Sequence, residues 1–118
     1  MKKFLAIYVG SMASSTMEKW NAMDEATRKK TGQLGMTEWM KWGEKNQKAI
    51  LDEGTPLGKT KRIDKNGISD VKNLMTGYTI IEAESHEAAA KVFLNHPHFA
   101  VFPGDSVEIM ECLPMPKM

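Results

Sequence analysis

The sequence has little cysteine, almost no net charge and no long apolar run. A single cysteine, Cys112, excludes an internal disulfide and fits a reducing compartment, so we expect a cytoplasmic protein. The net charge of +1 gives no field that would attract nucleic acid. The longest apolar run, residues 4–9, is too short to span a bilayer, and no signal-peptide cleavage site follows it. We therefore expect neither a nucleic-acid partner nor a membrane partner.

The composition is that of an ordinary globular chain. Of its 118 residues, 42% are hydrophobic and 26% are charged, which excludes a disordered protein. This length predicts one domain over residues 1–118, with residues 113–118 as an extended tail rich in proline and methionine.

Hydrophobic periodicity predicts two helices early in the chain. One is expected over residues 16–30, where Ser15 and Glu18 form a capping box and Gly32 can end the helix. The second is expected over residues 38–53, with Thr37 as its start and Gly54 as its end.

The remaining segments alternate between strands and a third helix. Residues 3–9 predict a strand that is apolar on both faces, and Asn66-Gly67 predicts a hairpin between residues 57–63 and 68–72. Ser85 is expected to cap a helix that runs to about residue 95 before Pro97. Two further strands are expected, over residues 75–83 and 106–113.

This element order, β-α-α-β-β-α-β, predicts an α+β fold of the ferredoxin-like, split βαβ type with an extra helix in the first crossover. The first and third strands of such a four-stranded antiparallel sheet are central, and they are the least polar strands here. The three helices cover only one face of the sheet. We therefore expect a homodimer that covers the other face, forming a dimeric α/β barrel.

Several stretches make the chain similar to the YCII-related family of small dimeric α/β-barrel proteins. They are "KFLAIYVG", "LDEGTPLG", "DKNGISD", "GYTIIEAESHEAA" and "NHPHFAVFPGDSVEIMECLPM". Some members resemble small-molecule enzymes in which a His–Asp pair does acid/base work in the barrel cleft. This chain has Gly10-Ser11-Met12-Ala13 where that histidine would stand. The resemblance therefore implies a role for only one member of the pair, Asp70 in Ser69-Asp70-Val71-Lys72.

Two histidines flank Pro97 and are the best candidates for chemistry. His96 is expected on the sheet-facing side of the preceding helix, where it could act as a general acid or base if it lines a cleft. The alternative is that His96 caps helical carbonyls while Pro97 and His98 shape a turn. The pair lacks the further ligands of a zinc site, so we expect no metal and no cofactor.

The second candidate site is an apolar helix face that carries two unexpected residues. Trp39 and Trp42 lie on this face beside Gly43 and Asn46, a glycine and an amide that a purely apolar contact would disfavour. We expect a ligand pocket between this helix and the sheet, with Tyr78 on its floor and His96 near one end.

Two short basic stretches are not nucleotide sites. "GTPLGKT" has three residues, not four, between its first glycine and Gly-Lys-Thr, and it follows a helix instead of a strand. "KTKR" suits a polar edge strand that resists aggregation.

Two functions remain open on the sequence alone. One is a small-molecule enzyme in which His96 and Asp70 transfer protons and Trp39, Trp42, Asn46, Tyr78 and His98 bind the ligand. The other is a non-catalytic homodimeric module that binds a small ligand or a partner.

Overall fold

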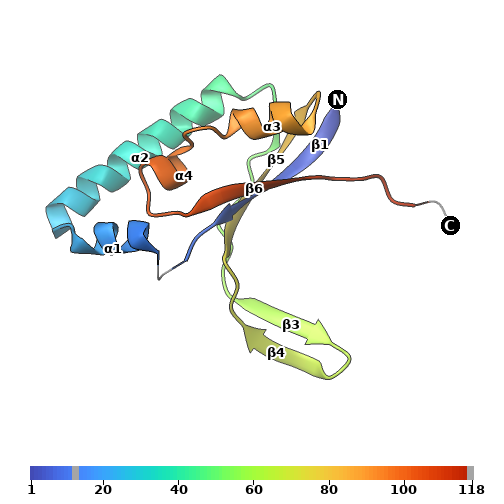
Figure 1. Cartoon of the computed structure of the whole chain (residues 1–118), viewed down its shortest axis with the longest axis horizontal. Helices are drawn as coiled ribbons and strands as arrows, with labels where there is room; N and C mark the ends of the chain where they lie inside the picture. The colour runs from blue at the N-terminus through green and yellow to red at the C-terminus, as the bar shows by residue number, and fades with distance from the viewer. Residues whose placement is uncertain (12–13, 117–118) are drawn as a thin grey trace.

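The computed structural model describes residues 1–11 and 14–116 of the chain, as an α+β fold (Figure 1). The elements, in chain order, are β1 (Lys2–Val9), α1 (Ser15–Ala22), α2 (Glu25–Lys45), β2 (Ile50–Asp52), β3 (Thr60–Asp64), β4 (Gly67–Val71), β5 (Met75–Ala83), α3 (His86–Val92), α4 (Pro97–Ala100) and β6 (Ser106–Glu111). Within the described ranges, none of the helices is long and apolar enough to cross a membrane.

The main sheet has four antiparallel strands in the order β2-β5-β1-β6. The two central strands, β1 and β5, are the two least polar ones, as the sequence predicts. Ala6 of β1 lies opposite Thr79 of β5 and Ile109 of β6, so these three residues share one face. The ferredoxin-like order predicted from the sequence is therefore confirmed.

The second strand of this sheet corrects the sequence prediction, which placed residues 38–53 in one helix. Helix α2 ends at Lys45, where the side-chain amide and the backbone N–H of Asn46 both donate to the carbonyl of Trp42. The side-chain amide thus adds a second hydrogen bond to a carbonyl in the last turn. The chain then turns, and Ile50 pairs with Ile81 at the edge of the sheet. Three residues are too few to show a period-2 pattern.

The boundary between the first two helices is also wrong in the sequence prediction. Ser14, not Ser15, caps α1, and its hydroxyl accepts from the N–H of Met17 at 3.1 Å. Asp24 starts α2 by accepting from the N–H of Thr27 at 2.7 Å, and this backbone hydrogen bond lowers the pKa of Asp24. Helix α2 continues through Gly32, which was expected to end a helix.

A second glycine of α2, Gly35, lies where the helix packs closely against another segment. Gly35 is buried, and a Cβ at this position would meet the ring of Phe102. The glycine therefore allows α2 to approach the segment before β6. Packing outweighs the low helix propensity of glycine, which costs about 1 kcal/mol.

The hairpin is confirmed, and it forms a separate two-stranded sheet, β3-β4. Gly67 has a φ of +114° in the turn, and Asp64 accepts from the N–H of Asn66 at 2.8 Å. Figure 1 shows this hairpin projecting away from the main sheet. Ile63 and Ile68 lie opposite each other and are both exposed.

The third predicted helix begins as expected, with Ser85 accepting from the N–H of Ala88, but α3 ends earlier, at Val92. Asn95 has a φ of +57°, and this left-handed residue reverses the chain before Pro97. Pro97 opens the short helix α4 in place of merely ending α3.

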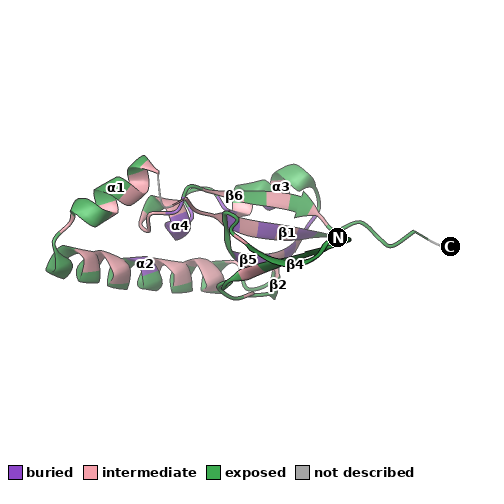
Figure 2. Ribbon diagram, turned by 90° about the horizontal axis from the view of Figure 1, so that it is seen from below, coloured by how far each residue is buried: buried purple, intermediate pink, exposed green. Residues whose placement is uncertain are grey.

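The two faces of the main sheet differ sharply. The helix-covered face is buried at Phe4, Ala6, Thr79 and Ile81, and Figure 2 shows buried residues concentrated in β1, β5 and α4. The opposite face is formed by alternate residues of the same strands: Leu5, Ile7, Tyr78, Ile80 and Met110. None of these five is fully buried, and Met110 is 43% exposed.

Candidate functional site

Helix α4 positions both histidines of the His-Pro-His motif. His96 is its N-cap residue, and the Nδ1 of His96 accepts from the backbone N–H of His98 at 3.0 Å. Because Nδ1 accepts, the proton of the neutral ring is on Nε2. The motif is therefore a helix start, which fixes the orientation of both rings.

His96 is completely buried in an aromatic cage. Its ring centroid lies 4.5 Å from that of Trp39, 4.6 Å from that of Trp42 and 5.1 Å from that of Tyr8. Its Nε2 has no hydrogen-bond partner within the described structure. Burial, and secondarily the neighbouring His98, lowers the pKa of His96 to about 3. The ring is therefore neutral at physiological pH.

His98 is placed differently, at the wall of a cavity. Its Nε2 lies 2.9 Å from the backbone carbonyl oxygen of Val9, so Nε2 donates to that oxygen. The neutral ring then carries its lone pair on Nδ1, which makes no hydrogen bond to another described residue. A Cβ at residue 104 would overlap the His98 ring, so Gly104 makes room for it.

A polar chain begins at Tyr8, which also borders the cavity. The hydroxyl of Tyr8 lies 2.7 Å from that of Thr79, which itself donates to the carbonyl of Glu53 at 3.0 Å. Since the proton of Thr79 is used for Glu53, Tyr8 donates to Thr79. Burial raises the pKa of Tyr8 to about 12, so this phenol remains protonated.

The cavity has a volume of about 650 Å³ and lies between α2, the ends of β1 and β5, and the loop after β2. Such a volume suits a small-molecule ligand. Aromatic residues from four parts of the chain border the cavity: Tyr8, Trp39, Trp42, Tyr78 and Phe102. Tyr78 lies opposite Ile7, so its side chain is on the open face of the sheet and does not face α2.

The loop at one rim depends on a glycine. Gly54 has a φ of +74°, and a Cβ there would overlap the carbonyl of Tyr78. Tyr78 in turn donates its N–H to Thr55 at 3.4 Å, and Pro56 bridges to Gly77. Gly54, Thr55 and Pro56 thus form a rim of the cavity, held against β5 by backbone contacts.

The structure brings most of the expected ligand-binding residues together. Trp39, Trp42, Tyr78 and His98 border the cavity, and a Cβ at Gly43 would meet open space. Asn46 is not among the lining residues, because its amide caps α2. Trp42 donates its indole N–H to the carbonyl of Val92 at 2.8 Å, which fixes the orientation of this indole.

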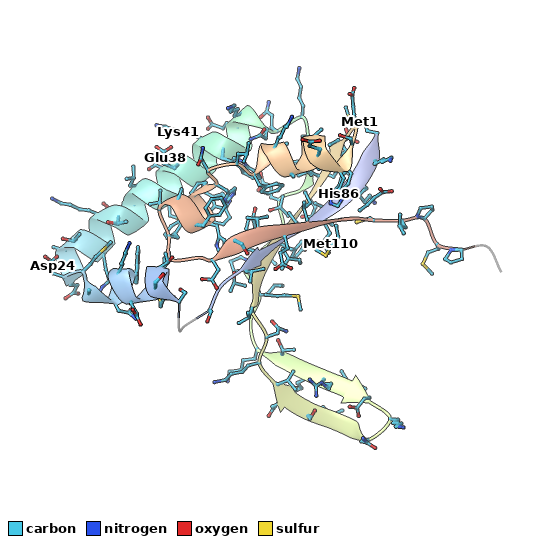
Figure 3. All side chains as sticks on the ribbon, in the orientation of Figure 1. Met1, Asp24, Glu38, Lys41, His86 and Met110 are labelled. Carbon is cyan, nitrogen blue, oxygen red and sulfur yellow. The ribbon has the colours of Figure 1, made fainter. Side chains whose placement is uncertain are left out.

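The two residues expected to transfer protons lie apart. Asp70 is on β4 of the projecting hairpin, where it accepts from the ammonium of Lys61 at 2.7 Å. His96 lies behind Tyr8, Trp39 and Trp42 in the body of the molecule. Figure 3 shows the hairpin side chains well separated from the body.

Two aromatic residues of the cavity were not identified from the sequence. Tyr8 was seen only as part of an apolar strand, and Phe102 only as part of a loop. Alternation along β1 places Tyr8 on the same face as Phe4 and Ala6, which gave a usable signal. Nothing in the sequence marks Phe102, whose position depends on the contact with Gly35.

Metal ligands do not gather around the cavity. Within residues 1–11 and 14–116, no three histidine, cysteine, aspartate or glutamate side chains form a group that could hold a metal ion. Cys112 is exposed, beyond the end of β6.

Comparison with known proteins supports the fold. No protein-family model and no curated protein sequence matches the chain. Among solved structures, the chain is similar to 5-chloro-2-hydroxyhydroquinone dehydrochlorinase (TftG) from Burkholderia phenoliruptrix AC1100, in complex with 2,5-dihydroxybenzoquinone. The two share 16% sequence identity and a TM-score of 0.51, over 92% of this chain and 90% of the other. At this identity the likeness shows a common α+β ferredoxin-like fold.

Proposed function

We propose that the cavity between α2 and the sheet binds a small, flat aromatic molecule. One observation carries this proposal: a wall of aromatic side chains encloses about 650 Å³ beside a histidine of fixed orientation. Aromatic walls with a few placed polar groups are typical of small-molecule sites. The similar structure was solved with a small quinone, a ligand of the same general shape.

Membership of the YCII-related family forms part of the proposal. The quoted stretches and the ferredoxin-like sheet support it. The family histidine that follows the first strand is missing here, and residues 12 and 13 of that stretch lie outside the described residues. His98, however, reaches the end of the first strand from α4 and donates to Val9. It thus brings an imidazole close to the end of the strand that the family histidine follows.

This placement favours acid/base catalysis as a second candidate function. A base works best when its other nitrogen is held by an acceptor, as the Val9 carbonyl holds His98. His98 Nδ1 would then take a proton from a bound phenol or similar acid. His96 would orient His98, because its Nδ1 accepts the His98 backbone N–H. Asp70 has no role in this proposed catalysis.

We propose that the protein forms a homodimer. The open face of the sheet carries Leu5, Ile7 and Ile80 without any covering helix. Covering this face with the same face of a second copy removes apolar area from water, at about 25 cal/mol per Å². Sedimentation at micromolar concentration measures this directly, and a stable monomer contradicts it.

Two variants, His98→Gln and the control His86→Gln, distinguish ligand binding from acid/base catalysis. In His98→Gln the amide can still donate to Val9, but the side chain cannot accept a proton. We expect aromatic ligands to bind this variant within a few-fold of the wild-type affinity, measured by NMR titration of the tryptophan indole N–H signals. Turnover of any substrate should fall by about 100-fold or more.

Three outcomes are informative. Full turnover in His98→Gln contradicts the catalytic role, and normal turnover is expected of the control His86→Gln, which is outside the cavity lining. Loss of aromatic binding in Trp39→Ala, with retention in His86→Gln, supports the cavity as the binding site. If no aromatic compound perturbs the indole signals, the binding proposal is wrong.

A further inference from the structure

The charges around the cavity have one sign. Glu44 in the last turn of α2 and Glu53 directly after β2 both border it. Among the residues that the structure describes, no lysine or arginine lines it. An anionic ligand such as a carboxylate would therefore meet two like charges and no ion-pair partner.

The end of α2 adds to this potential. Trp42, Gly43 and Glu44 are in the last turn of this 21-residue helix, and they line the cavity. The C-terminal end of a helix carries the negative end of its dipole, equivalent to roughly half an elementary charge. This end favours a cation beside it, independently of the two carboxylates.

The aromatic wall contributes in the same direction. The faces of tryptophan and tyrosine rings carry negative potential and attract cations. Trp39, Trp42 and Tyr8 border the cavity from two sides, α2 and β1. The Trp42 indole is held in place by its hydrogen bond to Val92. A ligand cation between these rings would need little rearrangement of the protein.

The lysines of α2 do not cancel this pattern. Lys41 lies beside Glu38, with 3.6 Å between the ammonium and the carboxylate, and Figure 3 shows both on the outer surface of the helix. Lys45 follows Glu44 but is not among the lining residues.

We infer that the ligand of this cavity is an aromatic cation: a flat ring that carries a protonated amine, or a positively charged nitrogen heterocycle. The inference rests on the proposed small-molecule function and narrows its ligand class. The ring packs against Trp39, Trp42 and Tyr8, and the positive nitrogen lies towards Glu44 and Glu53. The indole N–H of Trp42 and the hydroxyl of Tyr8, which an anion could use as donors, already donate within the protein.

Three soluble probes of equal size test this inference: phenethylammonium, phenethyl alcohol and phenylacetate. They share one ring and differ in charge. Titration of the ¹⁵N-labelled protein at low salt measures each Kd from the indole N–H signals of Trp39 and Trp42. We expect phenethylammonium to bind about tenfold more tightly than phenethyl alcohol, and phenylacetate to bind most weakly.

Neutral variants locate the charge effect. Glu44→Gln and Glu53→Gln should each weaken phenethylammonium binding by about twofold to fivefold and leave phenethyl alcohol unchanged. Glu87→Gln on α3 is the matched control, because it removes one exposed carboxylate that is outside the lining. It should change neither affinity.

The outcomes distinguish this inference from the proposed function. Equal binding of all three probes, or tighter binding of phenylacetate, overturns the aromatic-cation inference and leaves aromatic binding intact. If Glu87→Gln weakens phenethylammonium binding as much as Glu44→Gln does, the inference is also overturned. The preference for the cation would then come from the net charge of the protein. Binding of none of the probes overturns both.

Discussion

The buried His96 predicts a strong pH dependence of stability that a single substitution should remove. The perturbation is His96→Asn. An asparagine at this N-cap can still accept the backbone N–H of His98, as the Nδ1 of His96 does at 3.0 Å, but it does not titrate. The substitution therefore removes the ionisable group and keeps the start of α4.

The magnitude follows from the two protonation states. Burial lowers the pKa of His96 from 6.5 to about 3 in the folded chain. Above about pH 6.5 the ring is neutral in both states, and below it the unfolded chain binds a proton that the folded chain cannot bind until near pH 3. Stability is therefore lost as the pH falls through this window. Between pH 7 and pH 5 the loss from this residue is about 2 kcal/mol.

Urea unfolding monitored by far-ultraviolet circular dichroism measures the effect, at one protein concentration so that any dimerisation contributes equally. His96→Asn should be less stable at pH 7, because it loses contacts with Tyr8 and Trp39. Its decline in stability from pH 7 to pH 5 should nevertheless be about 2 kcal/mol smaller than that of the wild type.

The control is His86→Asn, which removes one exposed histidine from α3. It should leave the decline close to that of the wild type. If wild type and His96→Asn lose the same stability between the two pH values, the folded chain accommodates a protonated His96. The reasoning about its burial would then be refuted.

Three further predictions concern the fold. Gly32→Ala should raise the free energy of unfolding by about 1 kcal/mol, since nothing occupies the space of its Cβ. Gly35→Ala should lower it by about 1–3 kcal/mol, because the new Cβ would clash with Phe102. Urea unfolding of both variants measures this contrast. Replacing residues 59–73, the hairpin, by a short glycine-rich linker should leave the main sheet folded. The reason is that the Leu57 N–H donates to the Thr76 carbonyl at 2.9 Å and closes the base of the hairpin. Loss of the folded ¹H–¹⁵N spectrum would contradict this. Ile80→Lys, on the open face, should convert a dimer into a monomer in sedimentation, and an unchanged particle mass would place the interface elsewhere.

The sequence predicted those elements whose signals are local. The Asn66-Gly67 turn and the cap at Ser85 depend on nearby residues, and both are present. The central position of β1 and β5 follows from side chains that are apolar on both faces. These signals were sufficient for the fold class.

The errors came from contacts between distant segments. Gly35 is a helix-interior residue because Phe102 packs on it, and β2 is a strand because Ile50 pairs with Ile81. The site was affected in the same way. Four of the expected binding residues border one cavity, but the hairpin carries Asp70 away from it. Sequence spacing could not show that His98, rather than His96, borders the cavity.

The orientation of His98 depends on a main-chain oxygen, which every amino acid at position 9 would supply. The same carbonyl also accepts from the N–H of Asp105 at 2.9 Å, so it ties the ring to the connection that leads into β6. An alanine at position 9 would consequently leave this hydrogen bond in place. Replacing the peptide bond between Val9 and Gly10 by an ester, which weakens the oxygen as an acceptor, is the change that would reveal it.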